Sequence, residues 1–289
     1  PSNSSAASDV YKRQLYNPIE EYLYNTGRWD GKDRIRALAD LVPCNNPYWR
    51  ELFYRWFLSM TAHWQNIDRQ HGNNTSPLLV GAQGYRKSTF CRILLPPELR
   101  FGYTDSIDFK SKQEAERSLG RFFLINIDEF DQINANQQGF LKHLLQKPVA
   151  NLRKPYGSTI QEMRRYASFI GTSNLKDLLT DPSGSRRFIC IEVTGPIQTN
   201  VTINYRQLYA QAMHDIMKGE RYWLDDTDEA IVKEYNREFE RVDPLEELFL
   251  CHFRGAEESE EGEWLTAMQI FNDLQPVSYT HLRAHETEL

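Results

Sequence analysis

Residues 78–89, which read LLVGAQGYRKST, decide the fold of this chain. The three apolar residues predict a buried strand, and Gly81 and Gly84 let the backbone after it curl tightly. Phe90–Leu94 then has the pattern of a helix. This order of strand, Gly-rich loop and helix predicts a phosphate-binding loop, because the loop N–H groups and the helix N-terminus all point at an anion.

The polar side chains that end this loop indicate a nucleotide as the ligand. We expect Lys87 to bridge the terminal phosphates of ATP as a cation, and Ser88 to offer its hydroxyl to Mg²⁺. Arg86 departs from the usual pattern, in which a glycine precedes the lysine. Its side chain either points outward as a solvated surface residue or crowds the nucleotide. The predicted nucleotide-binding set is completed by Gly81, Gly84 and Thr89.

A second motif, LINIDE at residues 124–129, is an apolar strand that ends in two acids. Ligands of α/β proteins bind at the carboxyl ends of the strands. We therefore expect Asp128 to hold Mg²⁺ and Glu129 to orient and polarise the attacking water. The alternative is a strand that ends in two solvated acids. Asp131 is expected to cap a helix and not to bind the metal.

A third apolar strand ends in GTSN at residues 171–174. Asn174 is expected to contact the γ-phosphate or the attacking water, and its alternative role is to cap the next helix. Arg186 and Arg187 follow a short loop and suit an arginine finger that reaches the γ-phosphate of a neighbouring subunit. The alternative for them is a surface salt bridge.

Residues 153–157, RKPYG, lie between the second and third motifs. The proline and glycine predict a turn, so the segment is interpreted as the tip of a basic hairpin. Such a hairpin suits the backbone of single-stranded DNA, with Arg153 and Lys154 facing the phosphates and Tyr156 available to stack on a base. A plain solvated hairpin is the alternative.

The wider pattern predicts an α/β fold with a parallel sheet flanked by helices, since continuous apolar runs alternate with helical stretches. These runs are Leu78–Val80, Phe122–Ile127, Ala167–Gly171 and Phe188–Val193, with a further strand near Phe101–Tyr103. The expected organisation is an N-terminal helical segment at 15–70, an ATPase core at 71–197 and a helical, winged-helix-like module at 198–275. Residues 1–14 and 276–289 resemble translated sequencing adapters and are expected to be non-native.

Composition narrows the class of protein. Hydrophobic residues make up 40% of the chain and charged residues 26%, as in ordinary globular proteins. No apolar run approaches the roughly 20 residues that span a bilayer. The 4 cysteines are widely spaced and suit buried thiols in a bacterial or phage-infected cytoplasm. The net charge of -6 argues against a basic coat for nucleic acid but allows a local basic loop.

The order and spacing of these motifs resemble the virulence-associated E family, a group of phage and mobile-element proteins with an AAA+-like, superfamily 3-type helicase core. Residues 244–274 resemble the C-terminal extension of its Bacteroides-type members. The resemblance is carried by Asn17–Leu23, Trp29–Arg34, Gly81–Thr89, Asp128–Glu129, Gly171–Asn174 and Ser185–Phe188.

The resemblance implies a role in the replication of phage or integrated-element DNA. It also implies a hexameric ring of identical subunits, with nucleotide between them and Lys154 or its neighbours facing the central channel. The function expected is therefore that of an ATP-driven DNA helicase. Two alternatives stay open: a degenerate nucleotide-binding scaffold in oligomer assembly or phage interference, which Arg86 favours, and a small-molecule P-loop kinase.

Overall fold

The computed structural model describes residues 17–67, 73–153, 160–180, 186–241, 244–255 and 262–274. It divides the chain into two compact units, the first ending at Glu240 and the second beginning at Arg241. All the motifs expected to handle a nucleotide fall in the first unit.

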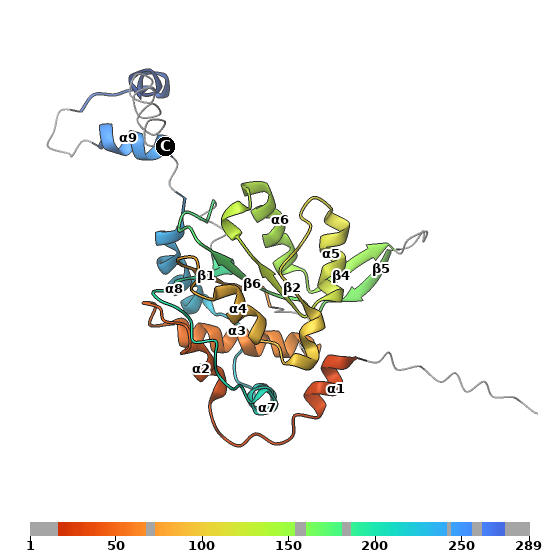
Figure 1. Cartoon of the computed structure of the whole chain (residues 1–289). Coiled ribbons are helices and arrows are strands. Elements are labelled where there is room, and N and C mark those ends of the chain that lie inside the picture. The colour runs from red at the N-terminus through yellow and green to blue at the C-terminus, as the bar shows by residue number, and fades with distance from the viewer. Residues whose placement is uncertain are drawn as a thin grey trace, which may run out of the picture. The chain divides into compact units, whose positions relative to one another are not determined.

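The first unit is built on a five-stranded parallel sheet in the order β2-β3-β6-β1-β7 (Figure 1). The predicted α/β fold is thereby confirmed. The strand expected near residues 101–103 is shorter and later, because Pro97–Gly102 forms a 3-10 turn, η1. The strands are β1 (Ser76–Val80), β2 (Tyr103–Thr104), β3 (Leu124–Ile127), β6 (Ser168–Ser173) and β7 (Phe188–Glu192).

Helices cover both faces of the sheet (Figure 1). One face packs against α3 (Trp49–Trp64), with α1 (Pro18–Tyr24), α2 (Arg34–Ala39), α4 (Lys87–Ile93) and α7 (Tyr205–Met217). The other face packs against α5 (Lys112–Arg121) and α6 (Ala135–Gln146). The apolar face of α3 is buried throughout, at Trp49, Leu52, Phe53, Trp56, Phe57 and Met60.

The Trp29–Arg34 segment ties α2 to α7 through one glutamine. The side-chain oxygen of Gln211 accepts hydrogen bonds from the backbone N of Arg34 at 2.6 Å and of Ile35 at 3.1 Å. Its amide nitrogen donates to Asp33 at 2.8 Å. Because these backbone N–H groups begin a helix and have no partner within it, Gln211 supplies what the helix end lacks.

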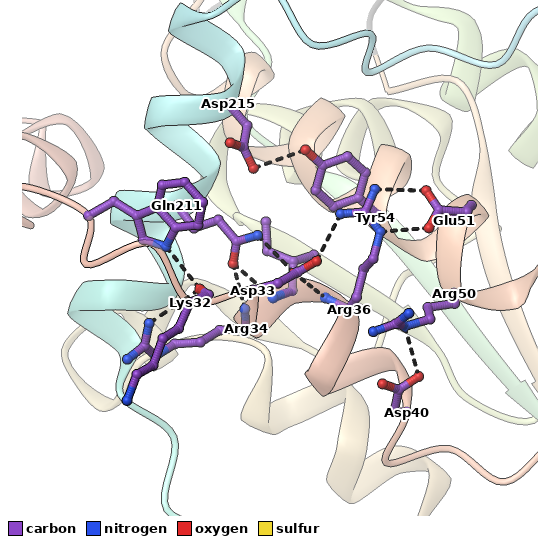
Figure 2. A network of polar contacts seen from close by, with 12 residues as sticks. Lys32, Asp33, Arg34, Arg36, Asp40, Arg50, Glu51, Tyr54, Gln211 and Asp215 are labelled. Atoms are coloured by element: carbon purple, nitrogen blue, oxygen red, sulfur yellow. Dashed lines mark hydrogen bonds and ion pairs between the residues drawn. The ribbon is translucent and has the colours of Figure 1, made fainter.

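Figure 2 shows how the same network continues into α3. Arg36 lies between Asp33 and Glu51 and donates to both carboxylates. Beside it the Tyr54 hydroxyl donates to Asp215 of α7 at 2.9 Å, and burial raises the pKa of that carboxyl. Polar side chains thus join α2 and α3 to α7, which lies far from both in the sequence.

The first unit extends beyond the boundary expected after residue 197. Helix α7 packs against α3, and α8 (Asp226–Asn236) packs against β7. A 3-10 turn, η4 (Arg237–Phe239), follows α8 and ends with a buried phenylalanine. The structure therefore divides the chain at Glu240 and not at 197.

A further prediction concerns a hairpin. The hairpin expected around residues 153–157 has its two antiparallel strands, β4 (Val149–Arg153) and β5 (Ile160–Arg164). Lys154 and Tyr156 lie outside the described residues, and so does the side chain of Arg153.

The second unit contains α9 (Pro244–His252) and a helix over residues 267–274. Thr266 caps that helix, since its hydroxyl accepts from the backbone N of Gln269 at 3.3 Å. Its described residues include no strand, so the winged-helix module stays a prediction. Residues 1–14 and 276–289 are outside the described part of the chain. Across the described residues, the helices are too short or too polar to cross a bilayer.

Candidate active site

The loop between β1 and α4 is held in shape by its neighbours. A Cβ on Gly81 would lie 2.7 Å from the carbonyl oxygen of Val193, so this position accepts only glycine. Gly84 has a φ of +86°, which glycine adopts without strain. The backbone N of Ile197 donates to the Tyr85 carbonyl at 3.0 Å. Contacts with Val193 and Ile197 therefore hold the loop in this conformation without a ligand.

Arg86 has the left-handed backbone that a glycine would supply at this place, with φ 61° and ψ 29°. An L-residue pays about 1–2 kcal/mol for this conformation. Since the arginine follows the glycine conformation, the loop keeps its path into α4. Arg86 therefore differs from the usual glycine in having a side chain and not in its backbone conformation.

Lys87 is buried within the loop and reaches the end of β6. Its Nζ donates to the carbonyl oxygens of Gly81 at 2.5 Å and Ala82 at 2.9 Å, and to Oδ1 of Asn174 at 3.0 Å. Burial lowers the pKa of the Lys87 ammonium, although the nearby Asp128 carboxylate acts in the opposite direction. The first and third sequence motifs therefore meet directly.

Asp128 joins the second motif to both of the others. Its Oδ1 accepts a hydrogen bond from the Ser88 hydroxyl at 2.9 Å, and the Thr172 hydroxyl donates to the same oxygen. A hydroxyl and a carboxylate side by side are the hard oxygen ligands that Mg²⁺ takes together with substrate phosphates. Ser88 and Asp128 therefore fit the metal expected from the sequence.

Asp131 does not cap a helix, contrary to expectation. Helix α6 is capped by Asn134, which forms a capping box with Gln137. Asp131 lies in the 3-10 turn η2 (Phe130–Gln132) and accepts from the Ser173 hydroxyl at 2.8 Å and from the Asn174 backbone N at 3.4 Å. It braces the end of β6, and the sequence offered no sign of this contact.

A cavity of about 390 Å³ opens where these motifs meet, large enough for a small-molecule ligand. Glu129 lines it from a left-handed backbone position, with φ 50°. Such strained positions gather at functional sites. The cavity is lined by Gln83, Gly84, Arg86, Lys87, Ser88, Thr89, Asp128, Glu129, Thr172, Ser173 and Asn174.

The two predicted finger arginines lie elsewhere. Arg186 pairs with Glu229 of α8 at 2.9 Å and lines a separate hollow beside that helix. Arg187 immediately precedes β7, and neither arginine is among the described residues around the 390 Å³ cavity. Within a single chain, the salt bridge that was the alternative for Arg186 is the observed state.

Comparison with protein families gives two matches. The model described as the virulence-associated protein E-like domain matches residues 23–241. A second, described as a domain of unknown function from B. Theta (DUF3874), matches residues 243–288, which include residues that were expected to be non-native. The search of curated proteins found no match.

Two solved structures of the C-terminal region of NrS-1, both apo, are similar to this chain. Each is 15% identical to it, with TM-scores of 0.43 and 0.44. Each alignment covers 81% of this chain and 53% of the other, so the chain spans about half the length of the solved structures it matches.

Proposed function

The chain belongs to the family of virulence-associated protein E-like domains, and we propose that its first unit binds Mg·ATP and hydrolyses it. One observation carries the proposal: side chains from three separate motifs are hydrogen-bonded in pairs around one cavity, Lys87 to Asn174 and Ser88 to Asp128. Side chains of these types are those that bind phosphates and magnesium in P-loop proteins.

Each side chain has a place in the proposed reaction. Lys87 exchanges its loop carbonyls for phosphate oxygens, and Ser88 and Asp128 would hold Mg²⁺, which would neutralise phosphate charge. Glu129 orients a water molecule and accepts a proton from it as the water attacks the γ-phosphorus. The bond from that phosphorus to the bridging oxygen breaks, and ADP and phosphate are released. Asn174 contacts the γ-phosphate from the end of β6.

The proposal extends to what the hydrolysis drives. We place the domain in a homo-oligomer, with a hexamer as the expected form, that moves along single-stranded DNA during the replication of phage or mobile-element DNA. The family resemblance and the β4–β5 hairpin, whose turn sequence is basic, support this. Arg186 acts in trans in such an assembly, and it must then leave Glu229.

The test is ATP hydrolysis by the full chain, with and without single-stranded DNA. We expect DNA to stimulate turnover and Lys87→Ala to abolish nucleotide binding. Glu129→Gln is expected to keep binding but lower kcat by about 10²–10⁴-fold, the usual contribution of a positioned base. An unchanged kcat in Glu129→Gln would show that this carboxylate is not the catalytic group.

A nucleotide-binding scaffold without turnover is the second candidate, and Arg86 in place of the usual glycine favours it. It predicts that the wild-type chain binds ATP but hydrolyses none of it, whether or not DNA is present and at any protein concentration. The same assay therefore separates the two functions.

A further inference from the structure

Arg86 lines the candidate nucleotide cavity without a role in the proposed chemistry. Arg86 is exposed. In the part of the chain that the structure describes, its guanidinium makes no hydrogen bond or ion pair. The backbone conformation at this position is left-handed and unfavourable for a side chain. A strained residue with an unengaged cation at the edge of a cavity is a candidate for contact with an anionic ligand.

The charges around the cavity favour such a contact. Its lining carries two cations, Arg86 and Lys87, and two carboxylates, Asp128 and Glu129. Lys87 is already occupied by two carbonyl oxygens and Asn174, whereas Arg86 is not. Without Arg86 the side chains of the lining would carry one cation against two carboxylates, so Lys87 and the metal alone would offset the charge of a polyphosphate. The arginine thus offsets a repulsion that the acid pair creates.

We infer that Arg86 is a ligand of the terminal phosphate of a nucleoside triphosphate, and that it makes this site prefer triphosphates to diphosphates. A guanidinium presents a planar fork of donors that matches two oxygens of one phosphate group. The terminal phosphate is the group with three free oxygens and the most charge. The inference rests on the proposed function, since it assigns a further ligand to the same site.

The experiment measures affinities of the full chain for Mg·AMP-PNP and Mg·ADP by calorimetry. In Arg86→Gly, which restores the usual loop residue, we expect affinity for AMP-PNP to fall about tenfold, the effect of one charge-assisted hydrogen bond, and affinity for ADP to change less than about twofold. Arg86→Lys is expected to recover part of the loss. The melting temperature of Arg86→Gly should be equal or higher, because glycine adopts this conformation freely.

Arg92→Ala is the matched control, since it removes an exposed arginine from the last turn of the same helix, α4. It should leave both affinities unchanged. Arg86→Gly with wild-type or tighter AMP-PNP binding would overturn the inference, and so would an equal loss for both nucleotides. Lys87→Ala distinguishes a failure of this inference from a failure of the proposed function. If this variant binds AMP-PNP like wild type, the proposed nucleotide site itself is wrong.

Discussion

The acids of the candidate site do different work although they are close in the sequence. Asp128 and Glu129 line the cavity, whereas Asp131 points at the end of β6. The 3-10 turn that follows β3 turns the chain so that Asp131 reaches Ser173 and the backbone of Asn174. Asn174 in turn accepts from Lys87. By holding the backbone of Asn174, Asp131 therefore positions the side-chain amide that accepts from Lys87.

We predict that Asp131→Ala lowers kcat for ATP hydrolysis by about 10–10²-fold, with nucleotide affinity changed less than about threefold, since a misplacement of about 1 Å in a positioning group costs up to about 10²-fold. Asn174→Ala should show the same pattern, and the double variant should lose little more than either single one. Steady-state kinetics together with nucleotide titration measure both quantities.

Asp177→Ala is the control for this prediction, because it removes an exposed acid from the segment just after β6. It should leave kcat and affinity as they are. Full additivity of Asp131→Ala and Asn174→Ala would mean that the two residues act independently, contrary to the contact seen in the structure.

The sequence indicated Lys87, Ser88, Asp128 and Asn174 because each stands in or after an apolar run, and parallel strands bring such positions to one edge of the sheet. It could not indicate Thr172 or Asp131. Their contacts depend on β6 lying between β1 and β3, and on the path of one short turn. Neither strand order nor turn path is encoded in a local pattern of polar and apolar residues.

At the scale of elements, the Trp29–Arg34 segment gains a structural role. The sequence marked it only through the family resemblance. In the structure it holds α2 and α7 together, with Gln211 at the centre of the contact and 1% exposed. The first unit therefore includes helices that precede the strands in the sequence and helices that follow them. The Trp29–Arg34 segment fixes the relative position of α2 and α7.

We predict that Gln211→Ala lowers the free energy of unfolding by about 2–3 kcal/mol, because it leaves buried N–H groups without a partner. Gln207, one turn earlier on α7, accepts from the Asp30 backbone at a more exposed place. Gln207→Ala should cost less than about 1 kcal/mol. Urea denaturation of the two variants makes the comparison, and equal losses would show that burial at Gln211 does not matter.

At the scale of the molecule, the chain divides where its family matches divide. The contact boundary at Glu240 falls at the end of the first match and just before the second. The sequence placed this boundary after residue 197, just beyond the last predicted strand, and assigned the helices that follow to the next module. An apolar stripe shows that a helix packs on something, but it does not show on what.

The last residues of the first unit predict where the chain can be cut. Phe239 is 3% exposed, and its carbonyl oxygen accepts from the backbone N of Leu178 at 3.0 Å and of Leu179 at 2.9 Å. A chain that ends after Glu240 keeps this contact, so we expect it to melt within about 2 °C of the full chain, a shift of less than about 1 kcal/mol, and to bind AMP-PNP equally well.

A chain that ends after Asn236 is the matched comparison, since it keeps all of α8 and loses only the turn that carries Phe239. Removing a buried phenylalanine costs about 3–5 kcal/mol, which lowers the melting temperature of a unit this size by roughly 6 °C or more. Differential scanning calorimetry of the two truncated chains decides the matter. Equal melting temperatures would mean that η4 adds nothing to the first unit, and a loss in the longer chain would mean that the second unit stabilises the first.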